Sequence, residues 1–240
     1  MIIETASIVN TLGESILRQG GRLQQLRSML LKPYELVWDC CCDHGLFGMS
    51  LMDSKYVQEI IFVDVLADQL NKLESSLSEK FPHNRYKWQV TCDDVRNIVV
   101  PKIDSQLFVL AGVGGGQTVD FINSLSISAA DTMFDILICS VHGSYFVRES
   151  LIDNGFSLID EKIILDKNKI YEGIYASRNS GKTIANTGYS MWNWKDQDHR
   201  RYWSRLVGHY AQRARNEPEK FRPIVEKYKA LKCELLGQLK

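Results

Sequence analysis

Acidic side chains follow three successive apolar segments of the chain. Asp39 lies at the end of "YELVWDC", Asp64 lies at the end of "EIIFVDV", and Asp93 and Asp94 follow "RYKWQVTC". A carboxylate can accept hydrogen bonds from two hydroxyl groups, and such charge-assisted bonds are strong. If the three segments are parallel strands, their carboxyl ends meet at the edge where open α/β sheets bind ligands. The acids therefore predict one ligand site that three strand ends share.

The chain from residue 34 alternates short apolar runs with segments of helical spacing, which include Leu66, Leu70, Leu73 and Leu77. This alternation predicts parallel strands with right-handed crossovers. The last two strand segments, "FSLIDEKIILD" and "KIYEGIYAS", are joined by a short turn at "KN" and indicate an antiparallel hairpin. We predict a Rossmann-like α/β sheet of the class I methyltransferase arrangement, parallel with a terminal antiparallel hairpin. A doubly wound nucleotide fold without the hairpin is the alternative.

The turn after the first strand, "CCCDHGLFG", carries acids where a dinucleotide site needs glycines. Gly45 permits a tight bend, but Asp43 would repel a pyrophosphate at the helix N-terminus. S-adenosylmethionine has no phosphate, and carboxylates attract its sulfonium and ammonium groups. The turn therefore favours S-adenosylmethionine over NAD. Asp64, 19 positions after Gly45, is predicted to bind the ribose hydroxyls, and Asp93 is predicted to reach the adenine.

Three consecutive cysteines, Cys40, Cys41 and Cys42, occupy the same turn. Adjacent residues on a strand point to opposite faces, so the three thiols cannot all bind one ion. Structural zinc sites use spaced pairs of cysteines, and the other three cysteines of the chain are isolated. We expect no metal here. The cysteines are interpreted as small apolar residues at the end of a buried strand.

The motifs "DCCCDHG", "VDV", "CDDV", "LAGVGGG" and "KIYEGIYAS" stand in an order that resembles the bacterial tRNA (adenine(22)-N1)-methyltransferase family. "GGRLQQL", which contains Arg22, is similar to the family's L-S-x-R-L start. The resemblance covers residues 20–177 and implies methylation of an adenine N1 in tRNA with S-adenosylmethionine as the cofactor. It implies these cofactor-binding residues: Arg22, Asp39, Asp43, His44, Gly45, Asp64, Val65, Asp93, Asp94, Ala111, Gly112, Gly114 and Gly115.

Two motifs depart from the family pattern. Cys41 replaces a glycine of the first motif, and Ser140, Val141 and His142 stand where the family has Q-P-N. The second departure bears on the substrate, so two alternatives stay open: another RNA or a small molecule as substrate, or a non-catalytic RNA-binding relative. Adenine N1 lies on the pairing edge, so the target base must be unpaired or flipped. We assign Asp43 and His142 as catalytic proton acceptors.

The chain changes character after residue 178. Residues 1–178 are predicted to form the cofactor domain with its N-terminal helices, over residues 4–30, and 179–190 a polar linker. Residues 191–240 are predicted to form a coiled-coil-like helical hairpin. Its first helix carries Arg200, Arg201, Arg205 and Arg213, which could neutralise RNA phosphates or form a solvated outer face.

The overall composition by itself excludes few classes of function. The 240 residues have a formal net charge of zero and a sequence pI of about 6.9, so any basic footprint for nucleic acid must be local. No apolar run approaches the roughly 20 residues that span a bilayer. The N-terminus lacks the order of charged, apolar and small residues of a signal peptide. We expect a soluble cytoplasmic protein without a membrane partner.

Overall fold

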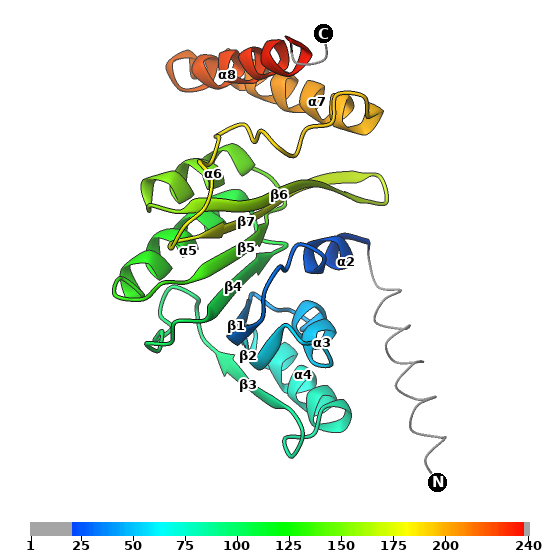
Figure 1. Ribbon diagram of the computed structural model, residues 1–240, viewed down its shortest axis with the longest axis vertical. Helices are drawn as coiled ribbons and strands as arrows, with labels where there is room; N and C mark the ends of the chain where they lie inside the picture. Colours follow the sequence, from blue (N-terminus) through cyan, green and yellow to red (C-terminus); the bar gives the residue numbers. More distant parts are fainter. Residues whose placement is uncertain (1–20, 238–240) are drawn as a thin grey trace. The chain divides into compact units, whose positions relative to one another are not determined.

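The computed structural model describes residues 21–237, which divide into two compact units (Figure 1). The first unit ends at Ile184 and the second begins at Ala185, within the segment for which the sequence predicts a linker. The predicted N-terminal helices correspond to α2 (Gly21–Arg27), and the remainder of that prediction, residues 4–20, lies outside the described residues.

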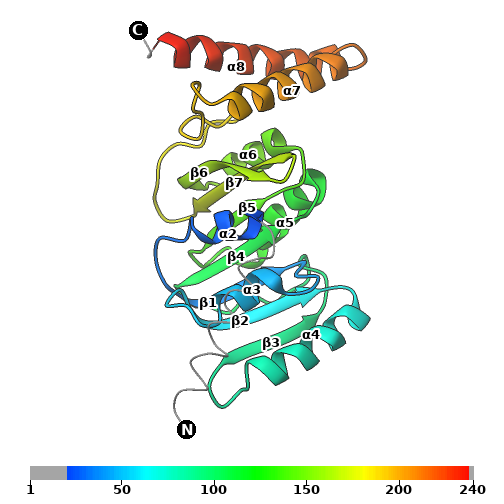
Figure 2. The same cartoon turned by 90° about the vertical axis from the view of Figure 1, so that its right-hand side faces the viewer.

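The first unit contains one seven-stranded sheet in the order β3-β2-β1-β4-β5-β7-β6 (Figure 2). The strands β1 to β5 pair in parallel, whereas β7 pairs antiparallel with both β5 and β6. The predicted methyltransferase arrangement is therefore confirmed. The strands are β1 (Tyr34–Cys40), β2 (Val57–Asp64), β3 (Lys87–Cys92), β4 (Gln106–Ala111), β5 (Asp135–Cys139), β6 (Ser157–Asp166) and β7 (Lys169–Ser177).

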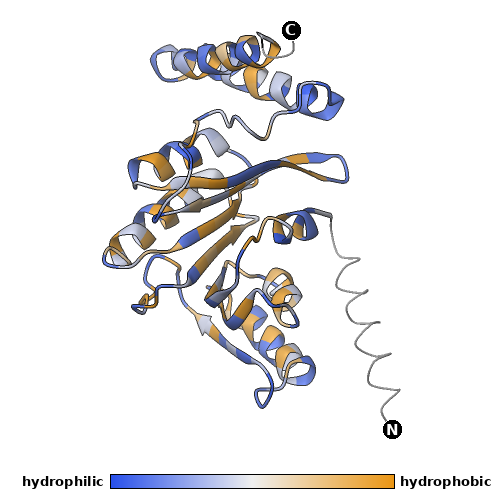
Figure 3. Cartoon of the chain, viewed as in Figure 1, coloured by the Kyte–Doolittle hydropathy of each residue, from blue (hydrophilic) through white to orange (hydrophobic). Residues whose placement is uncertain are grey.

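Helices cover both faces of this sheet, which explains why its central strands are apolar almost without interruption. One face packs against α2, α3 (Leu46–Leu51) and α4 (Ala67–Lys80), and the other against α5 (Gly115–Ser128) and α6 (Ser144–Asp153) (Figure 1). The hydropathy colouring shows apolar strands between helices whose outer faces are polar (Figure 3). The result is a three-layer α/β/α sandwich.

The strand order reverses at β1, which lies between β2 and β4. In open α/β sheets this reversal leaves a crevice at the carboxyl ends of the strands, because the crossovers on either side pack on opposite faces. The turns after β1, β2 and β4 meet there. These turns contain most of the residues that the sequence predicts for the cofactor.

Two helices start directly after turns at the carboxyl edge of the sheet. The helix α3 follows Gly45 and spans only six residues. Gly115 and Gly116 lie in the first turn of α5, directly after the loop that follows β4.

A buried ion triad joins α6 to the terminal hairpin. The Nη1 of Arg148 lies 2.6 Å from Oε2 of Glu161 on β6, and its Nε lies 3.0 Å from Oε2 of Glu172 on β7. The Arg148 and Glu161 side chains are fully buried, and Glu172 is nearly so. Because α6 begins directly after the turn that contains His142, the triad also anchors that turn.

The second unit is a pair of helices, α7 (Gln197–Arg213) and α8 (Pro218–Gly237), which lie side by side (Figures 1 and 2). The Asp196 side chain caps α7 by accepting from the backbone N–H of Asp198. Tyr210 of α7 stacks on Phe221 and Tyr228 of α8. The predicted helical hairpin is confirmed. None of the helices described over residues 21–237 is long and apolar enough to cross a membrane.

Candidate functional site

Asp64, at the end of β2, links two turns at the carboxyl edge of the sheet. Its Oδ2 accepts the backbone N–H of Asp43 at 3.0 Å, and its Oδ1 accepts that of Leu66 at 3.1 Å. The side chain is fixed by these bonds and is only 8% exposed. Each carboxylate oxygen has a second lone pair, so both can still accept a hydroxyl group. The arrangement fits the predicted ribose contact and adds a structural role that the sequence did not indicate.

The turn after β1 is built from residues in the left-handed region. Cys41 has φ 54°, Asp43 has φ 50° and Gly45 has φ 63°. A side chain at Gly45 would also collide with Leu73 of α4. The tight turn projects Asp43 and His44 into solvent, with 3.7 Å between Asp43 Oδ1 and His44 Nε2. Both predicted residues are therefore accessible at the site.

The three cysteines of this turn face different surroundings. Cys40 belongs to the core cluster on the α5 and α6 face, and the half-buried Cys41 packs against the same cluster, whereas Cys42 belongs to the cluster on the opposite face. Burial, followed by the charges of Asp64 and Asp94, raises the pKa of the Cys41 thiol to about 12. A thiol with this pKa stays protonated, which makes it a poor nucleophile and metal ligand. Over residues 21–237 no group of three ligating side chains could hold a metal ion.

The left-handed backbone at Cys41 leads to a stability prediction. A non-glycine residue there costs about 1–2 kcal/mol, so Cys41→Gly is expected to raise the free energy of unfolding by about 1 kcal/mol. Cys41→Ala keeps the Cβ and is the matched control, with no such gain expected. Urea denaturation of both variants measures the difference. Equal stabilities for the glycine and alanine variants would show that the turn is not strained at this position.

Asp39, near the end of β1, is buried beneath the turn. Its Oδ2 accepts the backbone N–H of Gly48 at 2.9 Å, which ties α3 to the strand. Burial raises the pKa of the Asp39 carboxyl to about 7; the Gly48 N–H opposes this shift and the nearby Asp64 charge adds to it. Asp39 therefore supports the turn from below, whereas Asp43 and His44 form its accessible surface.

The two acids after β3 have different partners. The backbone N–H of Asp93 continues the sheet ladder by donating to the carbonyl of Asp64 at 3.0 Å. The Asp94 carboxylate accepts hydrogen bonds from the Arg96 side chain and backbone, which hold the pKa of Asp94 below its usual range. Val65, between the two acidic turns, is 60% exposed and offers an apolar surface to a flat ring.

The glycine loop after β4 packs against the turn after β5. The backbone N–H of Val141 donates to the carbonyl of Val113 at 2.8 Å, and a Cβ on Gly114 would lie 3.4 Å from the His142 ring. At Gly115 a Cβ would lie 3.0 Å from Cα of Gly143 and closer still to the His142 carbonyl oxygen. This close approach explains why glycine is needed there, and it brings His142 to the loop predicted to border the cofactor.

Two neighbouring glycines of α5 make a matched pair for a test of this contact. Gly115→Ala is expected to destabilise the protein by about 1–3 kcal/mol, because backbone rather than a flexible side chain must move. Gly116→Ala meets nothing within 4 Å and is expected to be neutral or slightly stabilising. Thermal unfolding of the two variants measures the contrast. Two equal midpoints would contradict the packing of the two loops.

Arg22 reaches the loop after β4 from α2. Its guanidinium group lies 5.1 Å from the centre of the Tyr171 ring, and a Cβ on Gly112 would lie 3.6 Å from its Nη2. Gln25, one helical turn later, holds α2 on the edge strand: its Nε2 donates to the carbonyl of Leu165 at 2.7 Å. The geometry fits the prediction that Arg22 binds the cofactor carboxylate.

Some predicted residues are brought together and others are not. Asp39, Asp43, Asp64 and Asp93 gather around the ends of β1 and β2 through the contacts above. Over residues 21–237 no hydrogen bond or ion pair joins Asp43 to His142, so their shared catalytic role stays a prediction. The sequence did not indicate the contacts that Gln25, Gly48 and Tyr171 make with the site. Only Gly48, a glycine inside a helical pattern, carried a sequence signal of close packing.

The predicted RNA-contacting arginines all lie on α7 and are exposed. Arg200 donates through Nη1 to the carbonyls of Trp194 and Lys195, Arg201 pairs with Asp198, and Arg213 pairs with Glu217. Exposed ion pairs such as those of Arg201 and Arg213 contribute little stability, so these two arginines can exchange their partners for other anions. Residues 185–240 contain 12 basic and 6 acidic residues. The second unit is therefore basic, although the net charge of the whole chain is zero.

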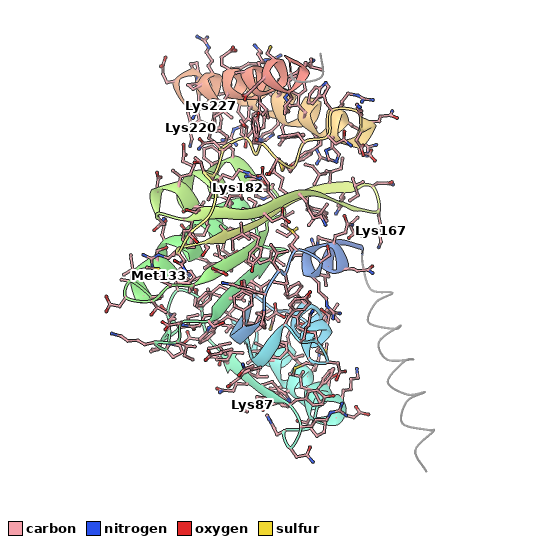
Figure 4. The ribbon with its side chains drawn as sticks, in the orientation of Figure 1. Lys87, Met133, Lys167, Lys182, Lys220 and Lys227 are labelled. Atoms are coloured by element: carbon pink, nitrogen blue, oxygen red, sulfur yellow. The ribbon has the colours of Figure 1, made fainter. Side chains whose placement is uncertain are left out.

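A cavity of about 400 Å³ lies at the opposite edge of the sheet, beside the starts of β2 and β3. Its lining includes Met52, Asp53, Arg85, Tyr86 and Lys87; Figure 4 labels the last of these. The hydroxyl of Tyr86 donates to Asp53 at 2.6 Å. None of the residues that the sequence predicts for the site lines this cavity.

The methyltransferase domain family matches residues 19–174. Among solved structures, M. capricolum TrmK in complex with S-adenosyl-homocysteine is 14% identical, with a TM-score of 0.69 over 87% of this chain and 95% of that one. The B. subtilis tRNA (m1A22) methyltransferase TrmK is also 14% identical, with a TM-score of 0.67 over 90% and 99%. Magnesium protoporphyrin IX methyltransferase from Synechocystis, solved with bound S-adenosylmethionine, is 16% identical, with a TM-score of 0.53 over 66% and 80%. No curated protein sequence matches the chain.

Proposed function

Because the chain belongs to the methyltransferase domain family, we propose that it transfers a methyl group from S-adenosylmethionine to N1 of an adenine in tRNA. The observation that carries this proposal is the extent of the fold similarity. The TrmK structures match 87–90% of the chain, which is more than the first unit alone, whereas the porphyrin methyltransferase matches 66%. The helical hairpin is thus part of what this chain has in common with the tRNA enzymes.

The donor set at the carboxyl edge of the sheet fits S-adenosylmethionine. Asp64 offers oxygen acceptors for the two ribose hydroxyls of the cofactor. The negative charge of Asp43 would attract the cationic groups of the cofactor, its sulfonium and its ammonium. Arg22 would bind the carboxylate of the cofactor, and the exposed Val65 would contact its adenine. When bound, S-adenosylmethionine supplies an electrophilic methyl group. A phosphate cradle is missing from the described turn, which disfavours NAD.

The chain's own residues would position the target base and accept a proton. In the loop after β4, a Cβ on Gly112 or Gly114 would be in van der Waals contact with Arg22 or His142, so the two glycines keep the space beside these side chains free. His142 is exposed next to Gly114, where it could accept a proton from the exocyclic amine of an adenine. Asp43 is the second candidate acceptor. Much of the rate enhancement would come from alignment of the base with the methyl group.

RNA binding is assigned to the second unit. We propose that Arg200, Arg201, Arg205 and Arg213 contact RNA phosphates, which the excess of basic residues in this unit supports. In this proposal residues 1–178 form the cofactor domain, 179–190 the linker and 191–240 the RNA-binding hairpin. We propose that the reaction takes place in the cytoplasm, where tRNA is available as the substrate.

Methyl transfer to unmodified tRNA tests the proposal. The protein is incubated with tRNA and S-adenosylmethionine carrying an isotopic label in the methyl group, and the tRNA is digested to nucleosides. Label is expected in 1-methyladenosine. His142→Ala is expected to lower the turnover number while it leaves binding of the cofactor unchanged. Label in another nucleoside would identify a different RNA methyltransferase, and tRNA without label would contradict the proposed substrate.

A further inference from the structure

Two of the five tryptophans of the chain lie next to each other in the second unit and are only partly buried. Trp38, Trp88 and Trp192 are buried, with at most 8% of their surface exposed. Trp194 and Trp203 are only partly buried, and their rings meet edge to face with 5.6 Å between centroids. A large apolar ring gains most from complete burial, so a partly buried pair leaves some ring surface for a further contact.

A cation accompanies these two rings. The Nζ of Lys232, on α8, lies 4.8 Å from the centre of the Trp203 ring and 5.7 Å from that of Trp194. Cation–π attraction holds the ammonium group at the indoles. Lys195 and Arg200 lie next to Trp194 in the chain and are also exposed. Of the acids nearby, Asp196 caps α7 and Asp198 pairs with Arg201.

The backbone of the loop that carries Trp194 is held by several hydrogen bonds. The backbone N–H of Asn193 donates to Nδ1 of His199 at 2.9 Å, and that of Lys195 donates to the Asn193 side chain at 3.1 Å. Arg200 donates to the carbonyl oxygens of Trp194 and Lys195 at 2.7 and 2.9 Å. The backbone at Trp194 therefore has defined partners before any ligand arrives, which lowers the entropy cost of binding there.

We propose that Trp194, Trp203 and Lys232 form a stacking site for an unpaired nucleobase of the RNA substrate. A nucleobase stacks on the exposed indole surface, and the ammonium group of Lys232 binds the adjoining phosphate. Positive charge on the rest of this unit favours the same partner: α8 adds Lys220 and Lys227, which Figure 4 labels, to the arginines of α7. This inference rests on the proposed function, since it names a second contact for the same RNA.

Binding of unmodified tRNA by single variants at several salt concentrations tests the site. Trp194→Leu is expected to raise the Kd for tRNA by roughly tenfold without changing its salt dependence, because stacking releases no counterions. Lys232→Gln is expected to weaken binding and to reduce the slope of log K against log salt by about one. Arg215→Gln, in the turn between α7 and α8, removes the same charge elsewhere and is expected to change the affinity much less.

The outcomes separate this inference from the proposed function. Trp203 also joins α7 to α8, because its Nε1 donates to the Tyr228 carbonyl, so a Trp203 variant would disturb the helix pair as well as the stacking site. The test of the stacking site therefore uses Trp194→Leu and Lys232→Gln. Their binding of S-adenosylmethionine is expected to equal that of the wild-type protein. Wild-type affinity for tRNA in both variants would overturn the stacking site alone. A wild-type protein that neither binds nor methylates RNA would contradict the proposed function as well.

Discussion

Arg148→Met is expected to lower the free energy of unfolding of the first unit by roughly 3–5 kcal/mol. The substitution keeps much of the side-chain volume but leaves Glu161 and Glu172 buried without the guanidinium group that lies 2.6 and 3.0 Å from them. The two carboxylates then lose the cation that offsets their desolvation. Denaturant unfolding, followed by circular dichroism, measures the loss.

A matched variant controls for the loss of an arginine. Arg96→Met breaks an exposed ion pair with Asp94, and such pairs contribute little to stability. Its unfolding curve is expected to overlay that of the wild-type protein. If Arg148→Met unfolds at the same denaturant concentration as Arg96→Met, the triad does not hold α6 against the β6–β7 hairpin.

Asp64→Asn is expected to raise the Kd for S-adenosylmethionine by roughly 10–100-fold, the range for loss of one charged hydrogen bond of about 1.5–3 kcal/mol. In the native protein the two Asp64 oxygens accept hydrogen bonds from the backbone N–H groups of Asp43 and Leu66. Asparagine keeps one of these oxygens, but its NH2 group is a donor and cannot accept the other hydrogen bond. The turn after β1 loses its link to β2, and the ribose loses a charged acceptor. Isothermal titration calorimetry measures the affinity.

Asp68→Asn is the control for this change, because it removes an equal charge from the exposed first turn of α4. Its affinity for S-adenosylmethionine is expected to match that of the wild-type protein. An Asp64→Asn protein that is folded and binds the cofactor normally would remove Asp64 from the ribose site.

The sheet and the position of the site could be predicted from local patterns. Acids after successive apolar runs placed Asp64 and Asp93 at the ends of neighbouring strands, and the turn at Lys167 and Asn168 marked the hairpin, as Figure 4 shows for Lys167. These features depend on residues close in sequence. Periodicity and turn chemistry are therefore sufficient to predict them.

The direction of individual side chains could not be predicted in this way. Asp39 and Asp64 look alike in sequence, yet Asp39 turns toward the Gly48 N–H below the turn, because α3 packs over it. Gln25 binds the backbone of Leu165, 140 residues away. Trp192 stacks on Tyr202, whereas Trp194, two positions later, stays partly exposed. Each of these contacts is decided by tertiary packing.

The measurement that tests the account most directly is a calorimetric titration of the wild-type protein with S-adenosylmethionine and, separately, with NAD. Acids clustered around the ends of β1 and β2 predict saturable binding of S-adenosylmethionine at micromolar concentration and no binding of NAD. Binding of NAD in place of S-adenosylmethionine, or no heat from either compound, would contradict a methyl-donor site at this edge of the sheet.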